Sequence, residues 1–346
     1  MKKIGFMGCG VIATYGHLPG ILETPGLELT SVYDPDPAQL ARFREHYASA
    51  RTFTDIDAFF QSGIDAVAVL SPAPFHLDNV CQAARYGKHI LCEKPLAMRD
   101  AEIEQMIRVT DAAGVVLSAA FCYRFSPVAL RIKELVANGA IGELRAMRLI
   151  YNWDLHGKFE TDASGARILS PRRVGRMVEG GPMVDCGVHQ IDLARWWTGS
   201  EFTRYTASGA WIDQDYQAPD HMWMHLDHAN GVHTAVEMSF AYTHTARDPL
   251  AHFSYHLLGT DGLIRFDRDD WHFELRNSHG TEFMGGASEK NFTGMYHAWR
   301  DALESGTNGD LPSAHDGLLV TRIARSATER VIAARDPAAF PAAAVL

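Results

Sequence analysis

A glycine-rich segment near the amino terminus constrains the fold of this chain more than any other feature. Gly8–Ala13 (GCGVIA) follows the apolar run Lys3–Met7 and precedes a helical stretch that reaches about Glu23. In the pattern G-x-G-x-x-A, the first glycine permits a tight turn, the second lets the backbone approach a pyrophosphate, and the small alanine allows close helix–strand packing. The phosphates then lie at the positive end of the helix. The spacing therefore predicts a dinucleotide-binding strand–helix–strand unit at the start of the chain.

An acidic residue at the expected distance supports this interpretation. Asp34 ends a second β-type run, Glu28–Tyr33, about 20 residues beyond the glycine loop. A carboxylate there accepts hydrogen bonds from ribose hydroxyls and repels a 2′-phosphate, and residues 34–41 contain no Arg or Lys. NAD is therefore favoured over NADP. The cofactor contacts predicted from this part of the chain are Gly8, Cys9, Gly10, Val11, Ile12 and Asp34.

The first 120 residues or so alternate strand and helix patterns. Further apolar runs at Ile64–Leu70, His89–Cys92 and Val115–Ala120 are separated by helical stretches. Strands that alternate with helices favour right-handed crossovers and a parallel sheet. Residues 1–124 are therefore predicted to form an NAD-binding Rossmann domain with a doubly wound parallel sheet.

The pattern changes after about Phe125. A helix over Pro127–Asn138 leads into β-type runs separated by Gly, Asn and Asp turns: Glu143–Trp153, Met222–Leu226, Val232–Tyr242, Phe253–Leu258 and Leu263–Phe266. Consecutive strands joined by turns indicate an antiparallel sheet, and two closing helices follow at 296–305 and 317–334. Residues 125–346 are therefore predicted to form an α+β domain for substrate binding and oligomerisation. Residues 157–179, which follow the run Glu143–Trp153, have the composition of a long irregular loop.

Charge and composition exclude several classes of function. The chain has 32 Lys and Arg against 42 Asp and Glu, a formal charge of −10, which disfavours a nucleic-acid or anionic-membrane partner. It contains no apolar stretch of ~18 residues and no signal-type segment, so a cytoplasmic location is expected. The five cysteines form no C-x-x-C pair, and neither a disulfide framework nor a cysteine zinc site is predicted.

The chain contains 17 histidines, which could indicate a metal site, but the spacing of the histidines along the predicted strands argues against one. On a strand, His221 and His225 would lie ~13 Å apart, too far for one zinc ion. Alternation instead places Met222, Met224 and Leu226 on one face of a strand. The opposite face then carries His221, Trp223, His225 and Asp227. No metal site is predicted.

Two further clusters carry polar chemistry. Ser71–His76 (SPAPFH) follows the third strand, and Gly87–Ala97 (GKHILCEKPLA) runs through a strand into a loop. This places Lys94 at the carboxyl end of a parallel strand, where doubly wound sheets bind ligands; the alternative is a solvated surface lysine.

Gly180-Gly181-Pro182 leads into a helix that carries Asp185, His189 and Asp192 at i, i+4 and i+7. The three side chains project from one helical face, and two carboxylates that bracket a histidine can fix its tautomer and raise its proton affinity. The alternative is a helix with a solvated polar face.

Together these motifs resemble the glucose–fructose oxidoreductase / inositol dehydrogenase family (Gfo/Idh/MocA). The resemblance covers nearly the whole chain and includes the glycine loop, S-P-x-x-x-H, the E-K-P block, Tyr123-Arg124-Phe125, Gly180–His189 with Asp192, and Leu258–Gly262. It implies an N-terminal Rossmann fold and a C-terminal domain with an open, predominantly antiparallel sheet. It also implies a homodimer or homotetramer assembled through that sheet.

The resemblance further implies an NAD-dependent dehydrogenase that acts on a secondary hydroxyl of a sugar, inositol or related polyol. Lys94, Asp185 and His189 are then the catalytic residues, with His189 as general acid/base and Lys94 as donor to the reacting oxygen. The reverse division, in which Lys94 carries the proton, stays open. Two alternatives remain: a redox-neutral NAD-dependent glycosidase and a non-catalytic dinucleotide sensor.

The remaining contacts are expected on two segments. The cofactor should also meet Ser71, Pro72, His76, Glu93 and Lys94. The substrate contacts are expected to be Lys94, Arg124, Trp153, His156, Asp185, His189 and Asp192.

Overall fold

The computed structural model describes residues 1–213, 216–286 and 290–335. It divides into two compact units, each built from two segments of the chain. The first unit comprises Met1–Ser126 and Lys290–Thr321, and the second Pro127–Glu289 and Arg322–Leu346. The first of these boundaries lies two residues from the division expected at Arg124. Residues 290–321, expected in the second domain, cluster with the first unit.

The first unit contains a six-stranded sheet in the order β3-β2-β1-β4-β5-β6, and every neighbouring pair is parallel. Its strands are β1 (Lys2–Met7), β2 (Leu27–Tyr33), β3 (Arg51–Phe53), β4 (Ala66–Val69), β5 (His89–Cys92) and β6 (Leu117–Ala119). The central strand β4 is wholly buried and apolar. The order reverses at β1, so the crossovers lie on both faces, and sheets of this kind bind ligands beyond the carboxyl ends of the strands at that point, here β1 and β4. The predicted doubly wound parallel sheet is confirmed.

Side-chain caps explain where several helices of this unit begin and end. Asp36 accepts a hydrogen bond from Ala38 N at the start of α2, Asn291 accepts one from Gly294 N at the start of α9, and Gly114 ends α5 in the left-handed conformation. The helices of the unit are α1 (Leu18–Leu22), α2 (Pro37–His46), α3 (Ile56–Phe60), α4 (His76–Arg85), α5 (Asp100–Ala113), α9 (Phe292–Ser305) and the first part of α10 (Ala314–Arg335). Short 3-10 turns lie at η2 (Ala73–Phe75) and η3 (Cys122–Phe125).

The second unit contains an eight-stranded sheet in the order β10-β11-β12-β7-β13-β14-β15-β16. Its strands are β7 (Leu144–Asn152), β10 (Phe202–Ala210), β11 (His221–His228), β12 (His233–Ser239), β13 (His252–Gly259), β14 (Gly262–Asp267), β15 (His272–Asn277) and β16 (Gly280–Gly285). All neighbouring pairs are antiparallel except β12 and β7, which are parallel. The sheet is therefore mixed and mostly antiparallel, as predicted.

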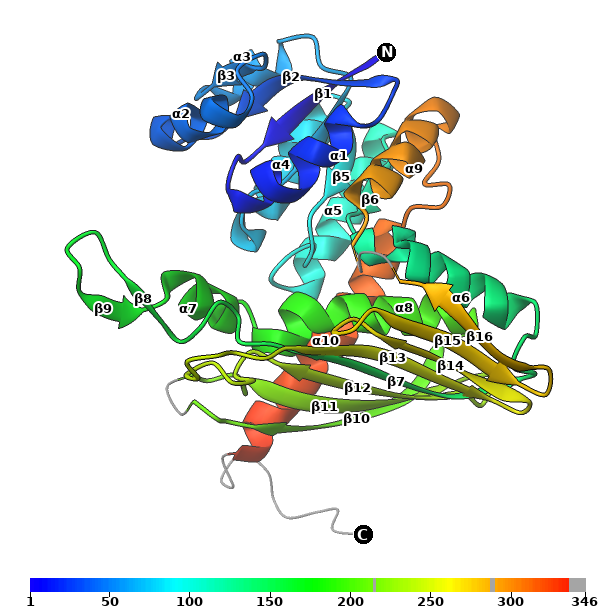
Figure 1. Cartoon of the computed structure of the whole chain (residues 1–346). Coiled ribbons are helices and arrows are strands. Elements are labelled where there is room, and N and C mark those ends of the chain that lie inside the picture. Colours follow the sequence, from blue (N-terminus) through cyan, green and yellow to red (C-terminus); the bar gives the residue numbers. More distant parts are fainter. Residues whose placement is uncertain (214–215, 287–289, 336–346) are drawn as a thin grey trace. The chain divides into compact units, whose positions relative to one another are not determined.

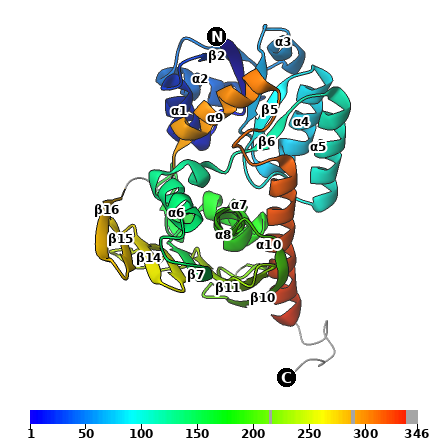
Figure 2. The same cartoon turned by 90° about the vertical axis from the view of Figure 1, so that its right-hand side faces the viewer.

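One face of this sheet is packed against helices. Figures 1 and 2 show α6 (Pro127–Ala137) and α8 (Val188–Thr198) on the same side of the sheet. The later part of α10 packs there too, because Thr328 Oγ1 contacts Met222 Sδ at 3.5 Å. Met222, Met224 and Leu226 are fully buried, whereas Trp223 and His225 between them are exposed. The predicted alternation of β11 is confirmed.

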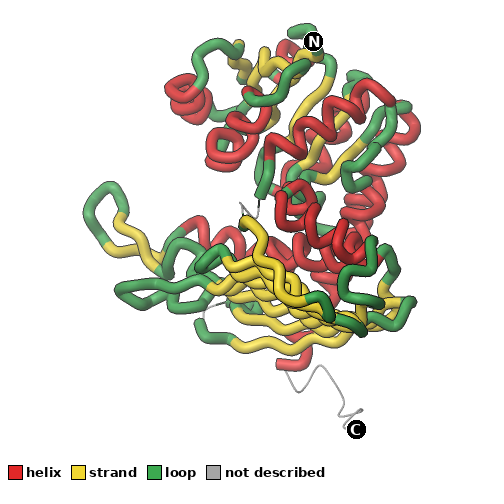
Figure 3. Tube along the Cα trace, turned by 45° about the vertical axis from the view of Figure 1, so that its right-hand side comes forward, coloured by secondary structure: helices red, strands yellow, loops and turns green. Residues whose placement is uncertain are grey.

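Residues 157–179 are not an irregular loop, so that expectation was wrong. They form a two-stranded hairpin, β8 (Phe159–Thr161) and β9 (Arg167–Leu169), and a helix, α7 (Pro171–Val178). The Asp162 carboxylate accepts hydrogen bonds from Ser164 N and Ala166 N and so closes the turn. Three-residue strands are too short to show a hydrophobic period, which is why the sequence pattern missed them. Figure 3 shows the hairpin standing apart from the large sheet.

Among the residues that the structure describes, no helix is long and apolar enough to span a membrane. The same ranges contain no group of three or more His, Cys, Asp or Glu residues that could hold a metal ion. All five cysteines are free thiols.

Candidate nucleotide-binding and catalytic site

The glycine loop has the local geometry that a dinucleotide requires. Gly8 has a φ of +94°, and a Cβ added there would lie 2.6 Å from Ser71 N, so only glycine fits this turn. At Gly10, no atom of the described chain lies within 4 Å of an added Cβ. Ala13 is fully buried against the sheet, whereas Val11 is exposed and Ile12 half-buried at the mouth of the loop. The open space at Gly10 and the close packing at Gly8 and Ala13 fit a bound pyrophosphate.

Asp34 is held against this loop by two backbone donors. Its Oδ2 accepts a hydrogen bond from Cys9 N at 3.1 Å, and its Oδ1 accepts one from Asp36 N at 3.0 Å. Burial, and then the adjacent Asp34 charge, raise the pKa of the Cys9 thiol to about 12, so the thiol stays neutral. The carboxylate is thus fixed at the end of β2, where ribose hydroxyls would meet it.

The helix after the glycine loop starts with a π-turn, η1 (Ala13–His17), before α1 begins at Leu18. Its i→i+5 hydrogen bonds widen the first turn, and such π-turns are frequent at functional sites. The turn buries the His17 ring completely beneath the loop.

The segment after β4 positions the next three predicted contacts. Ser71 Oγ accepts a hydrogen bond from Asn79 Nδ2 at 2.8 Å, and Pro72 precedes η2. His76 is buried among carbonyl oxygens: Nε2 lies 2.7 Å from Ser71 O, and Nδ1 lies 3.1 Å from Pro95 O. Burial lowers the pKa of His76, although the hydrogen bond to Ser71 O and the charge of Glu93 oppose this shift. His76 therefore ties the loop after β4 to the loop after β5.

The E-K-P block ends β5 and starts with a buried carboxylate. Glu93 is 7% exposed; its Oε1 lies 2.9 Å from His17 Nε2, and its Oε2 accepts a hydrogen bond from Lys94 N at 3.1 Å. His17 Nδ1 lies 2.9 Å from the Tyr296 hydroxyl. Lys94 itself is half-buried, and the Lys94–Pro95 peptide bond is cis.

Further charged groups gather around this block. Lys290 Nζ lies 5.8 Å from the ring centroids of both Tyr15 and Tyr123. Burial raises the pKa of the Cys122 thiol to about 12; the charges of Lys290 and Lys94 lower it by smaller amounts, and the charge of Glu93 adds to the rise. Arg124 is buried in η3, next to Tyr123.

In the second unit, the predicted triad occupies one continuous helical segment. A π-turn, η4 (Met183–Gly187), runs into α8, so Asp185 lies in the π-turn and His189 and Asp192 in the α-helix. Asp185 is 5% and His189 4% exposed, and Asp192 is buried as well. The alternative of a solvated polar face is therefore wrong. Ionisable side chains at this depth need partners, which makes the segment a candidate site.

A cation accompanies Asp185. Arg176 Nη1 donates to Glu179 Oε2 at 2.6 Å and lies 3.7 Å from Asp185 Oδ1. The charge of Asp185, followed by that of Glu179, outweighs burial and raises the pKa of Arg176 above its already high ordinary value. Arg176 thus stays charged beside Asp185.

Trp153 and His156 lie just beyond the end of β7. Their rings contact edge-to-face at a centroid distance of 5.0 Å, and Trp153 also stacks on Tyr151. Leu155 and His156 have positive φ values of 44° and 62°, which non-glycine residues rarely adopt outside strained or functional segments. His156 is exposed and Trp153 half-buried.

Three basic residues of segment 157–179 have partners within the second unit. Lys158 Nζ forms an ion pair with Asp213 Oδ2 at 2.9 Å, and the Arg167 guanidinium covers the Phe159 ring at 3.9 Å. Arg173 is fully buried, where it pairs with Asp220 and donates to Phe240 O. These contacts stabilise the packing of segment 157–179 within the second unit.

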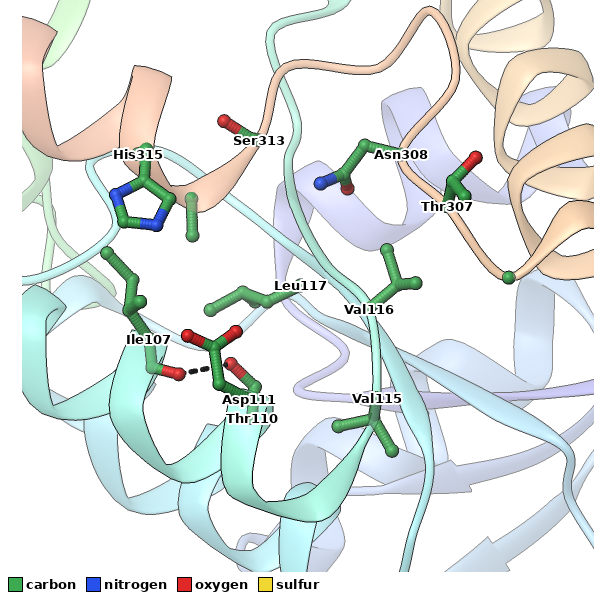
Figure 4. A pocket seen from close by; sticks show the side chains of 12 residues that line it. Ile107, Thr110, Asp111, Val115, Val116, Leu117, Thr307, Asn308, Ser313 and His315 are labelled. Atoms are coloured by element: carbon green, nitrogen blue, oxygen red, sulfur yellow. Dashed lines mark hydrogen bonds between the residues drawn. The ribbon is translucent and has the colours of Figure 1, made fainter.

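A separate pocket of about 300 Å³ lies in the first unit (Figure 4). It is lined by the end of α5, the start of β6 and residues 306–315, including Asp111, Asn308 and His315. It therefore lies at the amino ends of the parallel strands, the edge opposite the glycine loop. Thr110 Oγ1 donates to Ile107 O within its wall.

The sequence pattern does not single out His17 or Tyr296, and it marks Arg176 only as one of several basic residues in segment 157–179. A histidine four residues after Ala13 resembles any other helix residue, and Tyr296 lies 279 residues from its partner His17. The one available signal was the buried setting of Glu93, since a carboxylate in an apolar strand end needs a polar partner.

Comparisons with known proteins agree with this geometry. Residues 2–121 match the oxidoreductase family with an NAD-binding Rossmann fold (GFO_IDH_MocA), and residues 129–265 match the C-terminal domain of the GFO/IDH/MocA family. D-glucoside 3-dehydrogenase from Escherichia coli is 26% identical, over 69% of this chain and 70% of its own length. Inositol 2-dehydrogenase from Corynebacterium glutamicum (strain R) is 27% identical, over 92% and 90%.

The fold matches a solved oxidoreductase from Agrobacterium radiobacter in complex with NAD+, L-tartaric acid and magnesium. The TM-score is 0.80 at 22% identity, covering 95% of this chain and 96% of that one. The aldose-aldose oxidoreductase from Caulobacter crescentus gives a TM-score of 0.80 at 21% identity, covering 97% and 98%. The two family models together span most of the chain, which belongs to the GFO/IDH/MocA family of NAD-binding oxidoreductases.

Proposed function

We propose that this protein oxidises a secondary hydroxyl of a sugar, inositol or related polyol with NAD, or catalyses the reverse reduction. The observation that carries the proposal is the pair Asp185 and His189, two ionisable side chains buried on adjacent turns of η4 and α8. NAD supplies the hydride acceptor when it is bound. The protein must then remove the hydroxyl proton and stabilise the charge that develops on the oxygen.

His189 is the proposed general acid/base. Imidazole is the side chain whose proton affinity suits transfer near neutral pH, and nearby carboxylates fix its tautomer and favour its protonated form. Asp185 and Asp192 are carboxylates on the same helical segment as His189, so Asp185 would orient His189 or the substrate, with Asp192 in support. Arg176 keeps a positive charge beside Asp185 and so favours its ionised form.

Lys94 is the proposed donor to the reacting oxygen. Its place directly after β5, at the carboxyl edge of the parallel sheet, is where doubly wound folds bind ligands. The cofactor would lie along the glycine loop, Asp34, Ser71, Pro72, His76 and Glu93. Arg124, Trp153 and His156 are proposed substrate contacts.

The class of substrate rests on the relatives. The curated relatives include a D-glucoside 3-dehydrogenase and inositol 2-dehydrogenases, which share cyclic polyol substrates by name. We extend that substrate class to this chain. We also propose that the chain forms a homo-oligomer through the face of the eight-stranded sheet that carries Trp223.

A substrate panel tests the proposal. Purified protein is incubated with NAD and a set of sugars, glycosides and inositols, and the absorbance of reduced nicotinamide is followed. We expect turnover with at least one cyclic polyol, and a loss of kcat of ~10²-fold or more in His189→Ala and Lys94→Ala. The exposed His279 and Lys3 provide matched controls, since H279A and K3A should keep full activity.

Three other results would contradict it. Near-normal kcat in H189A or K94A would remove that residue from the reaction. Hydrolysis of a glycoside without net formation of NADH would indicate the redox-neutral glycosidase. Tight NAD binding without turnover of any compound in the panel would indicate a dinucleotide sensor.

A further inference from the structure

A buried chain of hydrogen bonds runs behind Lys94. The Glu93 side chain is 9% exposed and that of His17 is fully buried, and His17 Nε2 lies 2.9 Å from Glu93 Oε1. The second oxygen of Glu93 accepts a hydrogen bond from Lys94 N at 3.1 Å. On the far side, His17 Nδ1 lies 2.9 Å from the Tyr296 hydroxyl. The His17 ring of η1 therefore links Tyr296 of α9 to the carboxylate that directly follows β5.

The protonation pattern of this chain follows from its donors and acceptors. An ionised carboxylate only accepts hydrogen bonds, so His17 must donate from Nε2. Nδ1 shares a hydrogen bond with the Tyr296 hydroxyl, which accepts from a protonated ring and donates to a neutral one. Without that hydroxyl, His17 could move its proton to Nδ1 and turn a lone pair toward Glu93. Tyr296 thus keeps the donor side of the ring on the carboxylate.

The surroundings of Glu93 favour its charged form. Burial alone raises the pKa of Glu93, but the hydrogen bond and charge of His17 and the charge of Lys94 more than offset this, so the pKa lies below its ordinary value. Burial also raises the pKa of Tyr296 well above its ordinary value, which keeps that hydroxyl protonated. The charge of Glu93 in turn raises the pKa values of His76 and of the Cys92 and Cys122 thiols, whereas the charge of Lys290 lowers that of Cys122.

We propose that His17 and Tyr296 are positioning residues that keep Glu93 ionised, and that this buried charge holds Lys94 as an ammonium ion. The inference rests on the proposed function, in which Lys94 contacts the reacting oxygen. It deepens that function because it divides the roles of Lys94 and His189. An ammonium ion donates hydrogen bonds but accepts no proton, so His189 is the base that takes the hydroxyl proton, and Lys94 stabilises the oxygen.

The same contacts place Lys94 in space. The hydrogen bond from Lys94 N to Glu93 fixes the backbone from which the lysine side chain extends. His17 in turn is wedged between Phe6, Phe292 and Tyr296, at ring-centroid distances of 6.2, 5.1 and 5.7 Å. The lysine therefore has a defined anchor that is independent of any bound ligand.

The titration of Lys94 in the full-length protein tests this without any turnover. The protein is treated with trace acetic anhydride across a pH series, and acetylation at Lys94 is measured by peptide mass spectrometry. We expect half-maximal reaction of wild-type Lys94 at or above the ordinary lysine value of about 10.4. In Glu93→Gln, which keeps an oxygen for Lys94 N but removes the charge, the midpoint should fall by about one pH unit or more.

Two smaller changes test the positioning residues. His17→Phe removes the donor to Glu93, and Tyr296→Phe removes only one oxygen atom, so a folded variant remains even if E93Q is unstable. Both should lower the Lys94 midpoint, with the smaller shift in Y296F. Thr110→Val is the control, because this buried hydroxyl donates to the helix carbonyls of Met106 and Ile107, away from the His17–Glu93 hydrogen bond. Its midpoint should equal that of the wild type.

The outcomes separate this inference from the proposed function. An unchanged Lys94 midpoint in E93Q, or in both H17F and Y296F, would overturn the inference whatever the activity. A lowered midpoint in a protein that turns over no polyol would support the inference and reject the dehydrogenase. With an active enzyme, the alkaline limb of kcat in Y296F should move down in pH by the same amount as its acetylation midpoint, while KM for NAD changes little.

Discussion

We expect the choice between NAD and NADP to depend on Asp34. Its two oxygens are held by Cys9 N and Asp36 N, so the carboxylate cannot turn away from an adenosine ribose. A 2′-phosphate would therefore meet a fixed negative charge. The neighbouring chain offers no compensating cation, because residues 34–41 lack Lys and Arg.

The double substitution Asp34→Ser with Pro35→Arg should reverse this preference. The loss of a charged hydrogen-bond acceptor, worth about 1.5–3 kcal/mol, should lower kcat/KM for NAD by roughly 10- to 100-fold, while kcat/KM for NADP rises. Initial rates with each cofactor give the ratio. An unchanged ratio would show that Asp34 does not meet the ribose.

The residues of the site differ in how far the sequence could predict them. Gly8, Gly10 and Asp34 were predictable because their roles depend on backbone conformation and on a spacing that every such loop shares. His17 and Tyr296 were not, because their roles come from contacts with residues 76 and 279 positions away. Lys94 was predictable only as an end-of-strand lysine; the buried carboxylate behind it appears only in the fold.

At the level of elements, the two glycines of the loop are needed for different reasons: Gly8 for folding and Gly10 for cofactor binding. Gly8 needs its positive φ and its close approach to Ser71, which are properties of the folded protein alone. Gly10 has neither constraint, since its φ is ordinary and a Cβ there would meet only open space. Its absence of a side chain matters only when a pyrophosphate is bound.

Alanine at these two positions should therefore have opposite effects. G8A should destabilise the protein by at least about 1–3 kcal/mol, the usual strain of a disfavoured φ, because its Cβ also clashes with Ser71. G10A should keep the wild-type unfolding temperature and lose most of its affinity for NAD. Thermal unfolding and cofactor titration separate the two, and equal losses of stability in both variants would contradict this assignment.

Strand β12 contains an acid-sensitive group. Glu237 accepts a hydrogen bond from Asn152 Nδ2 at 2.8 Å, and His221 Nε2 lies 3.6 Å from its Oε1. The proximity of His221, followed by Asn152 and Arg148, outweighs burial and lowers the pKa of Glu237 to about 2. Because the unfolded-state pKa is higher, near 4.5, the stabilisation is present above that value and is lost as the pH falls toward 2.

Glu237→Gln should therefore cost stability at neutral pH and little in acid. Partial exposure limits the contribution to roughly 1 kcal/mol, or about 2–4 °C in Tm at pH 7. The difference from the wild type should shrink as the pH falls below about 4.5. Thermal unfolding from pH 7 down to the lowest pH at which both proteins fold checks this, and a constant difference would reject the assignment.

Elements were predictable where a continuous apolar run or a clear alternation marked them in the sequence. The central strands β1, β4 and β5 emerged from continuous apolar runs, and β11 from its alternation. The strand pair β15 and β16 did not, because β16 is exposed along most of its length and has no apolar period. The π-turns η1 and η4 were also missed, since a widened turn of five residues leaves the helical pattern on both sides intact.

For the whole molecule, the open face of the eight-stranded sheet is the surface on which assembly would depend. Among the residues that the structure describes there, Trp223 is 37% and Leu258 52% exposed, while histidines and carboxylates surround them. A single 38.3 kDa chain with this face uncovered would leave apolar side chains in water.

Light scattering of the wild type should therefore give a multiple of the chain mass. Trp223→Glu and Leu258→Glu, which would bury unpaired charge in such an interface, should raise the concentration for half-dissociation by at least about 100-fold, equivalent to ~3 kcal/mol. Leu130→Glu on α6, at a position 48% exposed, should leave the mass unchanged. A wild-type mass equal to one chain would reject this assembly.

The two-segment composition of the first unit has a consequence for how the protein is made. Its sheet is complete by Ala119, but α9 supplies Tyr296 to His17 and packs Phe292 against Gly16, and Pro312 O accepts a hydrogen bond from Ala119 N. During synthesis, the amino-terminal segment leaves the ribosome long before these partners exist. The nucleotide-binding unit therefore cannot complete its core until every strand of the other unit has been translated, and part of its apolar surface stays exposed until then. A fragment that stops at Ser126 would lack the wall behind its own glycine loop.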